Sequence, residues 1–176
     1  MGSSVFSLCE DYNKAKSSGT EAVWKFFENL LTRKADADVI RVFALEKLDN
    51  FTVEDGFLVA HGCYQVLMKF GQGGDIKRLR KIRYKLPALP GMRDYRVDFD
   101  ELVSVLEARQ EGRCDCQVRT RNNISPKNRL FRITAEESDQ EQQTTIYHTV
   151  CTLCGVKWTC VEDPTYHFPL FNWTED

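Results

Sequence analysis

Two pairs of cysteines in the last third of the sequence carry its clearest chemical signal. The pairs are Cys114 with Cys116 and Cys151 with Cys154, and Gly155 directly follows the second pair. Four thiolates form the closed, tetrahedral ligand set of a structural Zn²⁺ site, which leaves no open position for water or substrate. The spacing of the second pair is typical of a zinc knuckle. The sequence therefore predicts one structural zinc ion held by these four cysteines.

Two other residues near the second pair could replace a member of this ligand set. His148 precedes the pair and Cys160 follows it, and the first pair has a shorter spacing than most zinc-binding pairs. We expect His148 to be an ordinary strand residue and Cys160 to lie in the core, because free cysteine is among the most buried residue types. A redox disulfide between Cys151 and Cys154 is a further alternative, although nothing around it resembles a thioredoxin fold.

The sequence around the second pair resembles the zinc ribbons of transcript-cleavage elongation factors and small RNA polymerase subunits. The resemblance is carried by the polar run 137–147 and by the segment 151–158, which ends in Trp158. In those elongation factors, an acidic pair at a hairpin tip helps to hold a metal ion for RNA cleavage. The matching positions are Gln140 and Glu141, with Asp139 adjacent. The resemblance implies a zinc-stabilised hairpin and a setting in transcription.

Basic residues gather in two segments, although the whole chain has a net charge of −2 and a pI near 6.0. Any contact with nucleic acid must therefore come from local patches. The candidate phosphate-binding residues are Lys77, Arg78, Lys81 and Lys85 on an expected helix, and Arg119, Arg121, Lys127, Arg129 and Arg132 after the first cysteine pair. The alternatives are pairing of the basic helix with carboxylates elsewhere in its domain, and a solvated strand face.

Periodicity predicts an α+β protein with a helical domain at residues 1–110 and a β-rich zinc module at residues 111–176. Apolar residues recur at helical spacing in residues 20–110. The first expected helix is capped by Thr20, the second follows Asp36 or Asp38, the third begins at Thr52, and two more span residues 75–86 and 98–110. The expected strands are residues 117–120, 129–134, 144–150, 156–161 and a last strand within 166–173, with loops at 122–126 and 136–143.

Composition and sequence patterns indicate where in the cell the protein is located. No apolar run approaches the roughly 20 residues that span a bilayer, and the first residues lack the pattern of a secretory signal. Seven cysteines is an odd number, which argues against a fully paired secreted framework. We therefore expect an intracellular protein, in the cytoplasm or nucleus, that does not enter membranes.

No enzyme motif accompanies the cysteines. The three histidines are scattered, and the sequence contains no phosphate-binding loop, dinucleotide fingerprint or nucleophile elbow. The sequence thus predicts a non-enzymatic zinc-binding protein that contacts RNA or DNA. The alternative is a protein-interaction adaptor, such as an accessory or virulence factor that sequesters a host protein, in which zinc is purely structural. The residues do not distinguish RNA from DNA.

Overall fold

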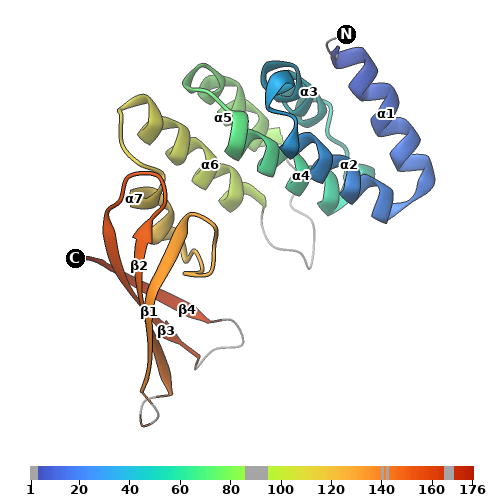
Figure 1. The fold of residues 1–176 in the computed structure, drawn as a ribbon. Coiled ribbons are helices and arrows are strands. Elements are labelled where there is room, and N and C mark those ends of the chain that lie inside the picture. Colours follow the sequence, from blue (N-terminus) through green and yellow to red (C-terminus); the bar gives the residue numbers. More distant parts are fainter. Residues whose placement is uncertain (1–3, 86–94, 140, 142, 165–168) are drawn as a thin grey trace. The chain divides into compact units, whose positions relative to one another are not determined.

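A computed structural model describes residues 4–85, 95–139, 141, 143–164 and 169–176 (Figure 1). The chain divides into two compact units, Met1–Gln110 and Glu111–Asp176, which we call the helical unit and, after the metal that the sequence predicts, the zinc module. The described residues form helices in the first unit and a four-stranded antiparallel sheet in the second. The expected α+β class is confirmed. In the described ranges, no helix has the length and apolar character needed to cross a membrane.

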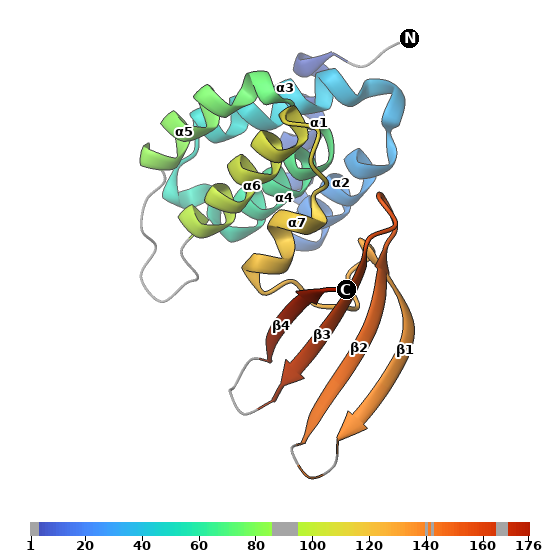
Figure 2. The ribbon, with the colours of Figure 1, turned by 90° about the vertical axis from the view of Figure 1, so that its left-hand side faces the viewer.

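The helical unit consists of helical hairpins stacked in two layers. Its α-helices are α1 (Val5–Ser18), α2 (Thr20–Thr32), α3 (Ala37–Asp49), α4 (Gly56–Phe70), α5 (Ile76–Lys85) and α6 (Tyr95–Gln110). Helices α1, α3 and α5 lie side by side in one layer, and α2, α4 and α6 form the other (Figures 1 and 2). Fully buried side chains such as Tyr12, Phe43, Leu79 and Leu102 fill the space between the layers.

Three short 3₁₀ turns set the starts of α3, α4 and α5. The turns are Lys34–Asp36, Val53–Asp55 and Gly73–Asp75, and each ends in an aspartate. The backbone N–H of each aspartate donates to the carbonyl three residues earlier, at 2.9–3.2 Å. The aspartate carboxylate in turn accepts a hydrogen bond from the residue three positions before it, which is Arg33, Thr52 or Gln72. In the turns that end at Asp55 and Asp75 the donor is a backbone N–H that a helix start would leave unpaired, whereas in the first turn it is the guanidinium of Arg33.

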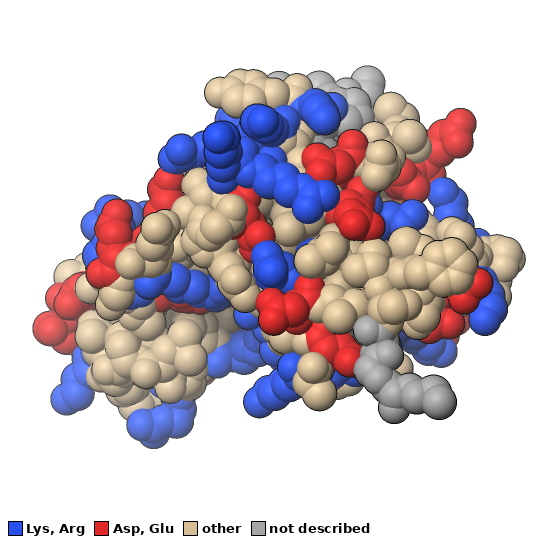
Figure 3. Space-filling view, turned by 90° about the horizontal axis from the view of Figure 1, so that it is seen from above, with Lys and Arg blue, Asp and Glu red and all other residues tan. Residues whose placement is uncertain are grey.

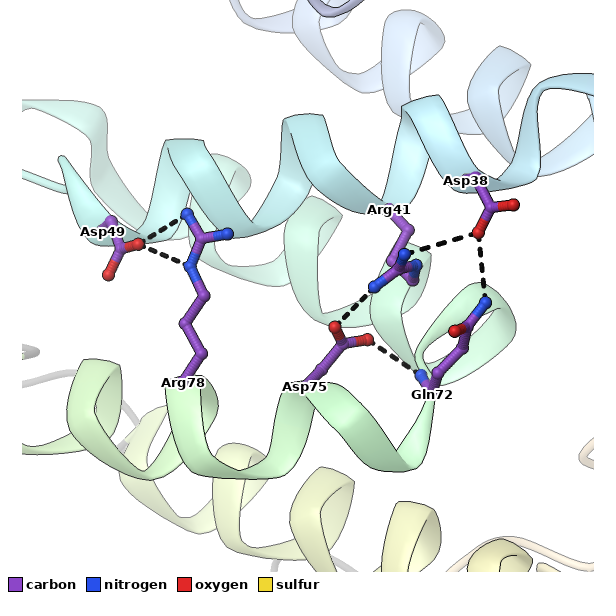
Figure 4. A network of polar contacts seen from close by, with 6 residues as sticks. All are labelled: Asp38, Arg41, Asp49, Gln72, Asp75 and Arg78. Carbon is purple, nitrogen blue, oxygen red and sulfur yellow. Dashed lines mark hydrogen bonds and ion pairs between the residues drawn. The ribbon is translucent and has the colours of Figure 1, made fainter.

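Ion pairs connect α3 to α5 (Figure 4). The guanidinium of Arg41 lies 2.5 Å from the carboxylate of Asp75, which is only 5% exposed, and 3.4 Å from the carboxylate of Asp38. The side chain of Gln72 also donates to Asp38, at 3.1 Å. Asp75 therefore has two tasks, because the same carboxylate ends its turn and holds Arg41.

The zinc module contains a short helix, α7 (Cys116–Arg119), followed by a meander of four strands. These strands are β1 (Phe131–Asp139), β2 (Thr144–Cys151), β3 (Lys157–Asp163) and β4 (Leu170–Glu175), paired in that order. One face of the sheet is apolar and carries the buried residues Phe131, Tyr147, Cys151, Trp158 and Cys160. On the other face, Arg132, Val150 and Lys157 lie in one row across three strands.

The structure differs from the expected elements in four places. Helix α1 was not expected, because only Leu8 and Tyr12 are buried along it and its apolar stripe is sparse. Thr20 is the first residue of α2 rather than its cap. Residues 117–120 belong to α7 and a 3₁₀ turn instead of a strand, although Val118 and Thr120 are β-branched. Residues 136–139 extend β1 instead of forming a loop, since a strand exposed to solvent needs no apolar residues.

Candidate metal centre

The four cysteines of the two pairs lie together in the zinc module. Their sulfur atoms are all within 4.8 Å of one another. The Sγ atoms of Cys114 and Cys151 are 3.7 Å apart, and those of Cys116 and Cys154 are 3.6 Å apart. A zinc ion with Zn–S bonds of about 2.3 Å requires sulfurs about 3.8 Å apart in a regular tetrahedron. A disulfide would need about 2.05 Å, and all four cysteines are free.

A tight turn positions the first pair. The backbone N–H of Gln117 donates to the carbonyl of Cys114 at 3.2 Å, and that of Val118 donates to the carbonyl of Asp115 at 3.1 Å. The turn continues directly into α7, which begins at Cys116. Because the chain coils at this point, a single intervening residue is enough to bring both thiols to the same site.

A knuckle turn positions the second pair. The backbone N–H of Gly155 donates to the carbonyl of Cys151 at 3.0 Å, and the N–H of Cys151 donates to the carbonyl of Val156 at 2.8 Å. Gly155 has φ +77°, a left-handed conformation that glycine adopts without steric cost. The turn exposes Cys154 and leaves Cys151 buried at the end of β2.

The cysteine cluster is part of the core of the zinc module. Cys116 and Cys151 pack with four buried residues, Ile124, Leu130, Phe131 and Trp158, while Cys114, Val156 and Trp173 pack against this group from its edge. The thiols are therefore held in place by the same contacts that hold the sheet against α7 and the segment that follows it.

Burial opposes ionisation of two of the four thiols, those of Cys114 and Cys116. Burial raises the pKa of Cys114 to about 11 and also raises the pKa of Cys116. Burial also acts to raise the pKa of Cys154, but hydrogen bonds from the Val156 backbone and the neighbouring thiols outweigh it, so this pKa is lowered. A metal ion ligated by thiolates would supply the missing positive charge and displace the protons.

Neither of the alternative ligands belongs to this group. Cys160 is fully buried on β3, opposite Tyr147 and Trp173. His148 lies on the other face of the sheet, where its Nδ1 is 3.2 Å from the hydroxyl of Thr159 and its Nε2 is 3.6 Å from Glu137. In the part of the chain that the structure describes, the four-cysteine group is the only cluster of three or more His, Cys, Asp or Glu side chains able to hold a metal ion.

The basic helix α5 is partly neutralised by its own unit. Arg78 is 2.6 Å from Asp49 of α3 (Figure 4), Arg80 is 2.5 Å from Glu107 of α6, and Arg83 forms an ion pair with Asp100 of α6. Three of the six basic residues of this helix are thus balanced by carboxylates of the same unit, as the alternative to phosphate binding predicts.

Three lysines of α5 are left without such partners. Lys77, Lys81 and Lys85 are exposed, and no described carboxylate forms an ion pair with them. Tyr84 lies next to them along the helix and is 83% exposed. Figure 3 shows Lys and Arg side chains gathered in this region, at the top of the view, with carboxylates along one border.

The basic residues of the zinc module are spread over α7, the following loop and β1. Arg119 is half-buried in α7, whereas Arg121, Lys127, Arg129 and Arg132 are exposed. The ammonium of Lys127 lies 5.5 Å from the centre of the Tyr147 ring. The expected phosphate-binding residues of this module thus come from three different segments of the chain.

The hairpin between β1 and β2 has polar residues at its tip. Asp139 ends β1, and its carboxylate accepts a hydrogen bond from the backbone N–H of Glu141 at 2.9 Å. The side chain of Glu141 is exposed. Gln140, the other position matched to the acidic pair of elongation factors, lies outside the described residues.

Sequence reasoning missed a hollow on the apolar side of the sheet, next to α7. It is lined in part by Gln117, Trp173 and Glu175, none of which stood out in the sequence. A lone glutamine and an acidic residue near a chain end carry no pattern, so only the folded arrangement brings them together.

Comparisons with protein-family models, curated proteins and solved structures found no match to the chain. The resemblance to zinc ribbons thus stays a prediction.

Proposed function

We propose that the protein is a non-enzymatic, intracellular zinc-binding protein that contacts RNA or DNA. Zinc is structural and is held by Cys114, Cys116, Cys151 and Cys154. Support for this metal comes from the all-sulfur donor set and from sulfur separations close to those of a tetrahedral zinc site. Seven free cysteines are compatible with a reducing compartment.

Unpaired positive charge is the observation that carries the nucleic-acid proposal. Arg129, Arg132 and Lys157 are exposed near the cysteine cluster and have no ion-pair partner among the described residues. The register of the strands places Arg132 and Lys157 on either side of Val150, on the solvent face. Zinc with four thiolates has a charge of about −2, so part of this positive charge offsets the site itself and the rest is available to phosphates.

The three lysines of α5 that have no ion-pair partner among the described residues supply a second contact surface. They recur every fourth residue, so they share one face of the helix, and Tyr84 adds an exposed aromatic ring beside them. Positive charge with an exposed aromatic ring is the combination that binds single-stranded nucleic acid, through phosphate contacts and base stacking.

Salt titration tests this function. Fluorescently labelled single-stranded RNA and DNA should bind the zinc-loaded protein, and the logarithm of affinity should fall with the logarithm of salt concentration by roughly 0.7 per phosphate contact. Replacing Lys77, Lys81 and Lys85 with Gln should lower the slope. The control is Lys34→Gln, an exposed lysine outside both surfaces, which should leave the slope unchanged. Absence of salt-dependent binding to either polymer would overturn the proposal.

A second candidate function, a protein-interaction adaptor, is favoured by a groove on the helical unit. The groove has a volume of about 250 Å³ and lies between α2 and α4, where Trp24, Leu31, Leu58 and His61 contribute to its walls. Trp24 is 44% exposed, and its ring stacks on His61. An adaptor would lose a protein partner on Trp24→Ser while its RNA and DNA titrations stayed the same.

A further inference from the structure

The zinc module contains a hollow of about 430 Å³ whose lining residues differ from the proposed phosphate contacts of β1 and α5. Its walls come from three places, with Arg113, Gln117 and Arg121 around α7, Trp158 on β3, and Trp173 and Glu175 on β4. Small-molecule sites in proteins range from about 300 to 1,000 Å³, so the hollow has room for one nucleotide-sized group.

The aromatic wall of the hollow is held by contacts within the module. The indole N–H of Trp173 donates to the carbonyl of Ile124 at 3.0 Å, and the ring stacks on Phe131 at a centroid distance of 4.5 Å. Trp158 meets Trp173 edge to face, at an interplanar angle of 85°. Trp158 is only 6% exposed, and its indole N–H is buried without a hydrogen-bond partner in the described structure. Such an unpaired donor is costly unless something accepts from it.

Two side chains of the hollow, Arg121 and Glu175, carry opposite charges but do not pair with each other. Arg121 and Glu175 are both exposed, and neither forms an ion pair with any described residue. Gln117 adds an amide that can both donate and accept. Arg113, in contrast, is held by Glu111 at 2.6 Å. A simple anion would be attracted by Arg121 but repelled by Glu175, so the hollow fits a ligand that presents donors and acceptors together.

We propose that this hollow binds a single unstacked guanine base of an RNA or DNA strand. Guanine presents two adjacent donors, N1–H and the N2 amino group, which one carboxylate can accept together, and two acceptors, O6 and N7, which suit an arginine. Glu175 takes the donors and Arg121 the acceptors, while an indole face supports the ring. This inference rests on the proposed function and adds base preference to it.

The other bases match the hollow less well. Adenine and cytosine each offer a single amino group to the carboxylate, and uracil offers only one ring N–H. A bidentate contact discriminates against a wrong base by about 1–3 kcal/mol, which is roughly 5- to 150-fold in affinity.

The experiment uses labelled eight-nucleotide strands of uridine in which one central position is G, A, C or U. We expect the G strand to bind at least about fivefold more tightly than the others. Glu175→Gln should abolish this preference without changing the salt slope, because it removes no phosphate contact. The matched control is Glu141→Gln, at the hairpin tip, which should retain the preference. Equal zinc content in all variants would show that the module is folded.

Each outcome separates the two proposals. Salt-dependent binding with no preference for G, or a preference that survives Glu175→Gln, would overturn the guanine site and leave the proposed function standing. If no strand binds, guanosine monophosphate is titrated while the indole NMR signals of Trp158 and Trp173 are followed. Shifts that Glu175→Gln removes would support the site and overturn polymer binding, and an absence of shifts would overturn both.

Discussion

The two units of this protein are stabilised by different interactions. The helical unit buries large apolar side chains from its stacked helices, and polar groups such as Asp75 accept hydrogen bonds at the helix starts. The zinc module has a core of only a few residues, and Cys116 and Cys151 are among them. In the first unit the polar residues lie outside the apolar core, whereas in the second two of the candidate metal ligands are members of the core.

Size explains the difference. Domains below about 70–80 residues rarely gain enough stability from apolar burial and need a metal or disulfides, and Glu111–Asp176 is shorter than this limit. Structural zinc contributes about 10–16 kcal/mol of apparent binding free energy in small zinc-binding peptides. We therefore expect the stability of the zinc module to depend on bound metal and that of the helical unit not to.

The largest expected effect is metal removal. Chelation, or Cys151→Ser, should unfold the zinc module completely and leave the helices intact, because the lost binding energy exceeds what the small core supplies. Circular dichroism should retain the helical signal while the amide NMR signals of β1–β4 collapse. Cys160→Ala, which changes a buried cysteine outside the cluster, should keep one zinc per chain. Retention of the sheet signals after chelation would break the comparison.

The next effect concerns the buried ion pair of the helical unit. Asp75→Ala should lower the free energy of unfolding of this unit by about 3–5 kcal/mol, since it removes the buried carboxylate from the half-buried Arg41 and leaves that guanidinium only the exposed Asp38. The Nε atom of Arg41 already lacks a hydrogen bond among the described residues.

The control for this variant is Asp38→Ala. Asp38 also pairs with Arg41, but its side chain is 77% exposed, so the cost should stay within about 1 kcal/mol. Urea denaturation followed by circular dichroism measures both. Equal losses of unfolding free energy in the two variants would show that the contribution of Asp75 does not depend on its burial. Zinc content should not change in either variant.

A smaller effect is expected at the contact between α2 and α4. A Cβ on Gly62 would lie 2.3 Å from the ring of Phe27, so Gly62→Ala should cost about 1–3 kcal/mol through overpacking. Gly74→Ala serves as the control, because a Cβ there meets nothing within 4 Å. Thermal unfolding of the helical transition compares the two, and similar midpoints would contradict close packing of this pair of helices.

The smallest effect is the aspartate turn before α4. Burial acts to raise the pKa of Asp55, but hydrogen bonds from the Thr52 backbone and from Lys16 outweigh it, so the pKa is lowered in the folded protein. The ionised carboxylate therefore stabilises the fold above the unfolded pKa, and this contribution disappears as pH falls through the folded value.

Asp55→Asn should accordingly cost about 1 kcal/mol at neutral pH, and the difference from wild type should vanish in acid. Glu54→Gln, an exposed neighbour, should have little effect at any pH. Denaturation midpoints across the acidic range provide the measurement. A difference that stays constant with pH would show that the charge of Asp55 plays no part.

Much of the architecture could be predicted from the sequence because the signals were local. Helical spacing located α2 to α6, and the cysteine spacing located the four-sulfur cluster. The polar helix α1 and the exposed end of β1 were missed, since neither needs a strong apolar pattern. The partners of Arg78 and Arg80 could not be predicted, because Asp49 and Glu107 are distant in sequence and meet them only through helix packing.

The aspartate turns before α3, α4 and α5 have a consequence for divergence. Each turn fixes where its helix begins through contacts within four residues. The helix interiors are then free to exchange side chains without shifting the register of the hairpins, provided that the aspartates at 36, 55 and 75 remain. Relatives of this chain should therefore keep these three aspartates at similar intervals even where most of the residues between them differ.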